Sequence, residues 1–257
     1  MKRESFTILG SSSGMPQANR ATAGYVLTVN GRLTLIDCGG GVCSSFLRCG
    51  FDPLHLDRVL ISHTHPDHVC ELPLFIQMSL LVGRTEKLDI YVPSEFVEPL
   101  SSFLPALYLI KERLPFALNV IGYEHGLRFS NDFTLIAVGN NHLRAYADFV
   151  ERMRLPNRMQ CHSFDIEVGG KSLLYSSDIR DLDDVRDHLA GKDYVVIEST
   201  HIDLEQFFAL APTLKVGMFV LTHLGSEDEI AAIRQSARKA GVDNLAVAFE
   251  GMELSLE

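Results

Sequence analysis

The sequence contains no tryptophan, and no part of it is apolar for the roughly 18 residues that a bilayer-spanning helix needs. We therefore expect no membrane partner. The 19 glycines are too few and too irregular for a collagen. Apolar residues make up 46% of the chain, which is too many for a disordered protein. A chain of 257 residues can bury a substantial core, and we expect a single domain over residues 1–257.

Basic residues are also scarce, with 23 Lys and Arg against 33 Asp and Glu, so the formal net charge is −10. This balance argues against extended nucleic acid held on a broad basic surface. It still allows an enzyme that engages one phosphate through a metal ion. Scattered solvated arginines are the ordinary interpretation of the remaining basic groups, although five of them could form a local basic patch: Arg20, Arg144, Arg152, Arg154 and Arg158.

The five cysteines are odd in number and lack paired spacing, so they do not predict a disulfide framework. The gaps between Cys38, Cys43 and Cys49 do not match those of a structural zinc site. The N-terminal stretch Met1–Gly10 has two basic residues but no apolar core of a signal peptide. These features predict a reduced, cytoplasmic protein.

Short strand-like runs dominate the chain and are separated by Gly, Asn and Asp. The expected strands are Phe6–Leu9, Tyr25–Val29, Leu33–Ile36, Arg58–Ile61, Leu118–Ile121, Leu127–Phe129, Phe133–Val138, Ser163–Val168, Ser172–Tyr175, Tyr194–Ile197, Val216–Leu221 and Leu245–Phe249, with Met252–Leu256 pairing beside the last. The expected helices are Pro73–Leu81, Glu95–Leu114 with a bend at Pro105, Leu182–Ala190, Leu204–Leu210 and Ser226–Ala240. Arg144–Arg158 is polar and irregular, so we expect a surface loop. This order predicts an α/β (α+β) fold with two sheets enclosed by helices.

Four residues of metal-binding type crowd into one short segment that follows the apolar run Val59–Ile61. Protonated imidazoles so close together would repel one another, whereas a metal ion binds them neutral. In an extended loop His63 and His65 project to the same side, and Pro66 can start a short helix. The geometry suits two metal ions, with one pair of ligands for each. The segment reads His63-Thr64-His65-Pro66-Asp67-His68.

Three further candidates, His142, Asp178 and His223, come directly after or close behind strand-like apolar runs. Ligands at strand ends are a common way to bring distant chain segments together at a sheet edge. Taken singly, the three could equally be a polar loop residue, a helix N-cap and a loop histidine.

The motif and the three later residues resemble the metallo-β-lactamase-fold hydrolases, which share a His-x-His-x-Asp-His motif followed by His, Asp and His in that order. The resemblance implies a four-layer αββα sandwich with two mixed sheets. It also implies that His63, His65 and His142 hold one metal, that Asp67, His68 and His223 hold a second, and that Asp178 bridges both. The class B β-lactamases generally lack that bridging carboxylate, so Asp178 counts against antibiotic hydrolysis.

Within this superfamily the chain is most similar to the tRNA 3′-processing endonucleases (ribonuclease Z) and related phosphodiesterases, through Leu9–Arg20 and Leu35–Gly41. Two departures argue against tRNA processing. Only 35 residues separate His142 from Asp178, which leaves no room for the long substrate-gripping arm of those enzymes. The segment that matches their His-Glu-Ala-Thr motif begins with Ile197, so the proton-donating histidine is absent.

His201, four residues after Ile197, is similar to the Ser-His pair of the short cyclic ribose phosphodiesterases, which also lack the arm. The resemblance then implies a dinuclear phosphodiesterase that hydrolyses a small or cyclic phosphodiester through a metal-bound hydroxide. Asp67 would orient or deprotonate the nucleophile, and His201 would protonate the leaving group. Zinc is the expected metal, with manganese or iron as alternatives.

Several alternatives stay open at this point. The same metals could serve tRNA 3′-end maturation or the hydrolysis of a thioester or lactone. A metal-binding scaffold that has lost turnover is a non-enzymatic interpretation. His201 could merely cap the following helix or face solvent, and His162 is expected to have a structural or surface role. A homodimer is also possible.

Overall fold

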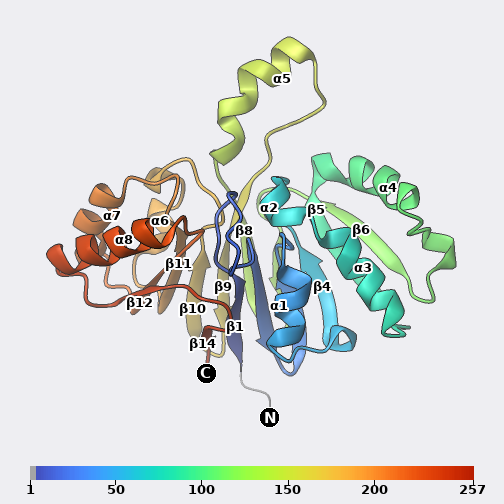
Figure 1. Cartoon of the computed structure of the whole chain (residues 1–257), viewed down its shortest axis with the longest axis horizontal. Helices are drawn as coiled ribbons and strands as arrows, with labels where there is room; N and C mark the ends of the chain where they lie inside the picture. Colours follow the sequence, from blue (N-terminus) through green and yellow to red (C-terminus); the bar gives the residue numbers. More distant parts are fainter. Residues whose placement is uncertain (1–3) are drawn as a thin grey trace.

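A computed structural model describes residues 4–257, so the beginning of the N-terminal stretch, Met1–Arg3, lies outside the described residues. Two seven-stranded sheets face each other (Figure 1). The first has the order β14-β1-β2-β3-β4-β5-β6 and the second the order β13-β12-β11-β10-β9-β8-β7. Both sheets contain parallel and antiparallel pairs, which confirms the predicted pair of mixed sheets. The strands are β1 (Ser5–Gly10), β2 (Gly24–Val29), β3 (Arg32–Ile36), β4 (Leu56–Leu60), β5 (Leu88–Pro93), β6 (Leu118–Tyr123), β7 (Arg128–Ser130), β8 (Thr134–Gly139), β9 (His162–Val168), β10 (Lys171–Tyr175), β11 (Tyr194–Glu198), β12 (Met218–Thr222), β13 (Leu245–Val247) and β14 (Glu253–Ser255).

Helices cover the outer faces of both sheets, as the predicted four-layer sandwich requires. In Figure 1, α1, α3 and α4 lie on the side of the first sheet, α6, α7 and α8 lie on the side of the second, and α5 projects from the top between them. The helices are α1 (Val42–Arg48), α2 (Pro66–Val69), α3 (Leu72–Leu81), α4 (Val97–Ala106), α5 (Ala147–Met153), α6 (Arg186–Leu189), α7 (Leu204–Leu210) and α8 (Glu227–Lys239).

Strand alternation explains why the first sheet can be buried on both faces. Along β2, Tyr25 and Leu27 belong to the core between the sheets, while Val26 packs into the second core under the helices. Successive side chains of a strand point to opposite faces, so one strand supplies both cores. The inter-sheet core also holds Tyr175 of β10, whose ring lies 4.4 Å from that of Tyr25 between centroids.

Several local predictions are wrong. Residues 95–114 do not form one bent helix, because α4 ends at Ala106, one residue after Pro105, and a single 3-10 turn follows at Lys111–Arg113. The last strand, β14, pairs with β1 at the edge of the other sheet and not with β13. The strand β5 and the helix α1 were not predicted. The expected loop Arg144–Arg158 contains α5, because its apolar residues recur at helical spacing.

Among residues 4–257, every helix is too short or too polar to cross a membrane.

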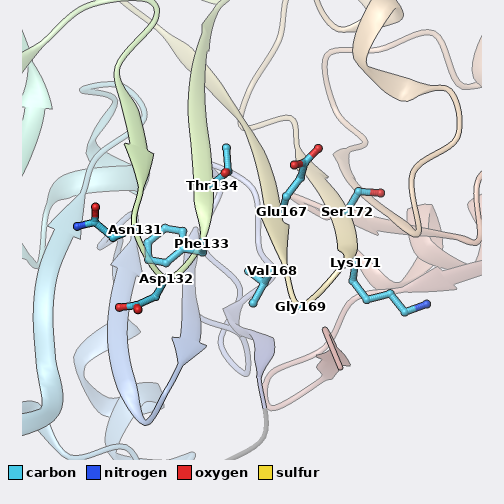
Figure 2. Close-up of a pocket in the computed structure, with 10 residues that line it drawn as sticks. Asn131, Asp132, Phe133, Thr134, Glu167, Val168, Gly169, Lys171 and Ser172 are labelled. Atoms are coloured by element: carbon cyan, nitrogen blue, oxygen red, sulfur yellow. The ribbon is translucent and has the colours of Figure 1, made fainter.

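A cavity of about 510 Å³ lies at the hairpin turns that join β7 to β8 and β9 to β10 (Figure 2). It is bounded by Asn131–Thr134 on one turn and by Glu167–Ser172 on the other. Figure 2 shows the side chains of Asp132 and Lys171 pointing away from each other. These turns lie at the start of β8 and β10, whereas the candidate ligands His142 and Asp178 follow the opposite ends of the same two strands. This cavity is therefore not the candidate site.

Candidate metal centre

The motif after β4 divides its four ligand candidates between a loop and a helical turn. His63 and His65 lie in the extended loop, with ring centroids 4.9 Å apart. Pro66 is the first residue of α2 and His65 is its N-cap, so the chain turns there. Asp67 and His68 lie on that turn. Proline fits the first helical position because its fixed φ suits a helix and its missing N–H would have no partner there.

In the second sheet each candidate site residue follows the end of a different strand. His142 begins a 3-10 turn after β8, Asp178 follows β10, His201 follows β11 and His223 follows β12. Because β10, β11 and β12 run parallel, their carboxyl ends meet at one edge of the sheet. This edge faces the motif of the first sheet, and the structure brings all seven predicted ligands together there.

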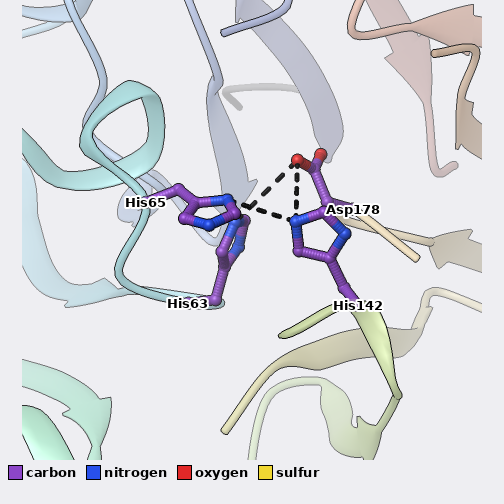
Figure 3. A group of neighbouring side chains, drawn as sticks. All are labelled: His63, His65, His142 and Asp178. Atoms are coloured by element: carbon purple, nitrogen blue, oxygen red, sulfur yellow. Dashed lines mark hydrogen bonds and ion pairs between the residues drawn. The ribbon is translucent and has the colours of Figure 1, made fainter. Parts of the chain in front are cut away.

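The first group consists of His63, His65, His142 and Asp178, whose side chains converge in Figure 3. The His142 Nε2 atom lies 3.1 Å from His65 Nδ1 and 3.6 Å from Asp178 Oδ2. His63 Nε2 lies 3.9 Å from the same carboxylate oxygen.

The second group consists of Asp67, His68, Asp178 and His223. The His68 Nε2 atom lies 3.3 Å from Asp178 Oδ1, and His223 Nε2 lies 3.4 Å from Asp178 Oδ2. Asp67 Oδ2 lies 3.2 Å from His223 Nε2 and 3.6 Å from His68 Nε2. Asp178 thus belongs to both groups and is the candidate bridging residue.

These spacings fit divalent cations. Ligand atoms 2.0–2.2 Å from one tetrahedral ion are separated by roughly 3.3 Å, and the distances within both groups scatter around that value. His63 Nε2, His68 Nε2 and Asp178 Oδ1 are buried without a hydrogen-bond partner among the described residues. Within residues 4–257, Asp178 forms ion pairs only with histidines. Buried polar atoms left in this way normally have a partner, which a metal ion would supply.

The histidines of the first group have lowered pKa values, which favours cation binding. Burial lowers the pKa of His63 well below its usual range and also lowers the pKa of His65. Burial lowers the pKa of His142 to about 4. Three imidazoles are therefore neutral near pH 7, which is the form that binds metals.

In the second group a histidine is protonated and a carboxylate is charged near pH 7. Burial alone would lower the pKa of His68, but the carboxylates of Asp178 and Asp37 raise it well above its usual range. Burial would likewise raise the pKa of Asp178, yet the charges of His68 and His223 hold it well below its usual range. A cation entering this group must displace a proton from His68.

Asp37 is a functional candidate that the sequence marked only as part of the stretch Leu35–Gly41. Its Oδ2 accepts hydrogen bonds from His68 Nδ1 at 2.9 Å, Tyr175 Oη at 2.8 Å and Ser62 Oγ at 2.9 Å, and its Oδ1 accepts one from the Ser62 N–H at 2.7 Å. A carboxylate on the far nitrogen of a ligating histidine fixes the ring and its tautomer. The same test that found Asp178, an acidic residue after an apolar strand, would have selected Asp37.

Thr200 plays the corresponding part for His223, since its Oγ1 lies 2.7 Å from His223 Nδ1. Glu198 is buried and accepts hydrogen bonds from the N–H groups of Thr200 and His201 through Oε2. The other oxygen, Oε1, lies 3.3 Å from His201 Nδ1. Glu198 therefore supports the turn that carries Thr200 and His201.

His201 lies at the edge of the site, with 39% of its side chain exposed. Its ring centroid is 4.7 Å from that of His142 and 5.4 Å from that of His223, and its Nδ1 lies 3.9 Å from Asp178 Oδ2. The Glu198 carboxylate raises the pKa of His201, so the ring can hold a proton near neutrality. This placement is compatible with the predicted proton-donating role, which stays a prediction.

The backbone is strained where it turns into the site. Asp37, Ser177 and His223 have φ values of 59°, 52° and 54°, in the left-handed region that side chains other than glycine rarely adopt. Such strain costs on the order of 1–3 kcal/mol per residue and persists where the surroundings impose it.

The remaining histidines lie apart from both groups. His162 is buried, and its Nδ1 lies 3.3 Å from the Ser62 carbonyl oxygen, which agrees with the expected structural role. His55, His125 and His188 are not among the grouped ligands of residues 4–257, and neither are the cysteines.

The family model described as a β-lactamase superfamily domain matches residues 32–224, a range that includes all seven candidate ligands. The chain therefore belongs to the β-lactamase superfamily, as the motif resemblance implied. Membership in this family supports the expected class, a metal-dependent hydrolase.

Relatives named ribonuclease Z match in two ways. The protein of Clostridium botulinum (strain Alaska E43) is 34% identical over 134 residues, which cover 52% of this chain but only 40% of the relative. The protein of Methanosarcina acetivorans is 26% identical over 299 positions, which cover 97% of both chains. Because this chain has 257 residues, that relative carries at least 42 residues that this chain lacks.

Solved structures share the fold. The metallo-β-lactamase fold protein YhfI of Bacillus subtilis superimposes with a TM-score of 0.76 at 20% identity and covers 99% of both chains. Human short-form tRNase Z gives a TM-score of 0.68 at 18% identity, over 98% of this chain and 99% of that one. A diphosphatase of the PhnP family gives 0.64 at 17% identity, over 99% and 98%.

Proposed function

We propose that this chain is a metal-dependent phosphodiesterase that binds two divalent cations and hydrolyses a small or cyclic phosphodiester. The observation that carries the proposal is the sharing of Asp178 between two groups of nitrogen and oxygen donors, each spaced for one ion. Zinc is the first choice for both ions, because three neutral histidines with an open position are typical of catalytic zinc. Manganese and iron remain alternatives, since carboxylates take part in both groups.

When bound, two such cations would lower the pKa of a water molecule and neutralise negative charge on the phosphate. Asp67 is positioned to orient the attacking water and to accept its proton, because its carboxylate is 12% exposed while the neighbouring His68 is buried. Asp37 and Thr200 hold His68 and His223 from behind, so neither ring can rotate away from the site.

His201 is proposed as the group that gives a proton to the departing oxygen. Its Nδ1 is turned toward Glu198, which leaves Nε2 as the atom that can donate. General-acid assistance of this kind contributes ~10²–10⁴-fold. The role fits the exposed edge of the site, where the leaving group must depart.

Processing of tRNA 3′ ends is the second candidate, and the names of the sequence relatives favour it. The net charge of −10 and the residues missing relative to the Methanosarcina protein weigh against a large polyanion. Hydrolysis of a thioester or lactone stays an alternative prediction for the reaction. The single domain over residues 1–257 and the homodimer also stay predictions.

The test combines metal analysis with a substrate panel of bis(p-nitrophenyl) phosphate, a 2′,3′-cyclic nucleotide, a precursor tRNA and a thioester. The proposal predicts about two transition-metal ions per chain and the highest kcat/KM on a small diester. A protein that holds no transition metal, or that cleaves only the precursor tRNA, would refute it.

A further inference from the structure

A cavity of about 300 Å³ lies beside the metal centre, between the loop that carries His65 and the segment 142–157 that carries α5. Thr64 and His65 line one side, and Tyr146, Phe149 and Val150 line the other. The rings of His65 and Tyr146 meet edge to face, with centroids 5.8 Å apart. A candidate metal ligand is therefore also a wall of this cavity.

Large apolar side chains are exposed along this segment. Tyr146 is 50% exposed, Phe149 57%, Met153 64% and Leu155 49%. Tyr146, Phe149 and Met153 are spaced three and four residues apart, so they share one face of the helical segment. Apolar groups gathered at the surface beside a polar site mark a place where a ligand is buried.

The segment is fixed at both ends. At its start, the side-chain amide of Asn141 donates a hydrogen bond to Asp184 Oδ1 at 2.6 Å. At its end, Glu95 accepts hydrogen bonds from the backbone N–H groups of Arg158 and Gln160. These anchors join the segment to both halves of the fold, so the cavity is formed before any ligand arrives.

The charges around the cavity exclude a second phosphate site. Glu95 lines it, but its oxygens are already taken by two N–H groups. Among the described residues that line the cavity there is no lysine or arginine. Arg152 instead lies over the Phe149 ring, 4.6 Å from its centroid, and holds that ring in place. The walls therefore suit an uncharged aromatic group, and the volume is at the small end of the roughly 300–1,000 Å³ typical of ligand pockets.

We propose that this cavity binds an aromatic ring on one ester arm of the substrate, such as a nucleobase or aryl group, while the phosphate occupies the metal centre. The inference rests on the proposed function and narrows its substrate class. Tyr146 and Phe149 supply aromatic faces and edges against which such a ring can pack.

Binding to the metal-loaded protein tests this without relying on turnover. Isothermal titration with methylphosphonate and benzylphosphonate compares two ligands that share the same anionic head and differ in the ring. We expect benzylphosphonate to bind about tenfold more tightly, because its ring is removed from water in the cavity. In Phe149→Ala and in Val150→Asp this advantage should fall below about threefold.

The matched control is Phe103→Ala, which removes a similarly exposed aromatic residue of α4 outside the cavity and should leave the advantage intact. Equal binding of the two phosphonates, or an advantage that survives both cavity substitutions, overturns the aromatic site while leaving the phosphodiesterase proposal standing. Failure of methylphosphonate to bind the metal-loaded protein would instead count against the metal centre as a phosphate site, and with it against both proposals.

Discussion

The two sheets contribute to the site in different ways. The first supplies four ligand candidates from one continuous segment, His63–His68, behind a single strand. The second supplies His142, Asp178 and His223 one at a time, behind β8, β10 and β12. A local motif can be read from spacing alone, whereas the separate residues come together only because parallel strands end at one edge. The first half of the site is thus encoded by sequence proximity and the second by topology.

The hydrogen bonds that hold the motif in place come partly from the other sheet. Tyr175 and Ser177 of the second sheet's side donate hydrogen bonds to Asp37 and to Ser62 in the first. His162 at the start of β9 lies against the Ser62 carbonyl oxygen. The motif is local in sequence, but its geometry depends on the packed partner sheet.

Removal of the shared carboxylate should have the largest effect. Asp178→Asn keeps the shape but removes the charge common to both groups, so metal content should fall below one ion per chain. We expect kcat/KM on a phosphodiester to fall on the order of 10³-fold. Metal analysis and steady-state kinetics measure both, with the exposed Asp183→Asn as control. Two retained ions with full activity would show that the second sheet does not complete the site through Asp178.

Loss of His201 should come next, and its effect should depend on the leaving group. His201→Ala should lower kcat by roughly 10²-fold on a diester with an alkoxide leaving group and much less on a p-nitrophenyl ester. The reason is that a good leaving group departs without a proton. The half-buried His188→Ala, outside both metal groups, is the control. Equal losses on both substrates would remove His201 from proton transfer.

A pH effect should reveal the contact between the sheets at His162. Burial lowers the pKa of His162 to about 4, below its unfolded value near 6.5. Between these values the unfolded chain binds a proton that the folded chain does not, so acid favours unfolding. From pH 7 to pH 5 this should cost about 2 kcal/mol.

The free energy of unfolding of His162→Gln can be measured in urea at pH 7 and at pH 5. Its decrease between these pH values should be about 2 kcal/mol smaller than that of the unchanged chain. The exposed His55→Gln should unfold with the pH dependence of the unchanged chain. An identical pH dependence in His162→Gln would mean that His162 is not held neutral at this contact.

The smallest effect is expected from the hydroxyl that links the sheets through Asp37. Tyr175→Phe removes one of the donors to that carboxylate but leaves the others, so metal affinity should fall by about tenfold. Competition with a chelator measures the change, and Tyr194→Phe on the neighbouring strand is the control. An unchanged affinity would show that Asp37 positions His68 without help from the second sheet.

Much of the fold and of the site follows from the sequence, because the signals are local. The two strands on either side of Asn30-Gly31, the helix that begins after Ser226 and the crowded motif are each predicted from residues that lie close together in the sequence. Strand ends then led to Asp178 and His223. The pairing of β14 with β1 and the contact between Asp37 and His68 were not predictable in this way, since each joins residues whose separation in sequence carries no periodic signal.

The segment between His142 and Gln160 contains none of the grouped ligands, and it is held near its start by Asn141 and at its end by Glu95. Its length can therefore change without moving a ligand, and each doubling of a flexible loop adds only about 0.6 kcal/mol of closure cost. If the cavity binds one arm of the substrate as proposed, insertions or deletions in this segment would change which substrates bind and would leave the metal ligands in place. Grafting a different segment between His142 and Gln160 is then a direct route to altered selectivity.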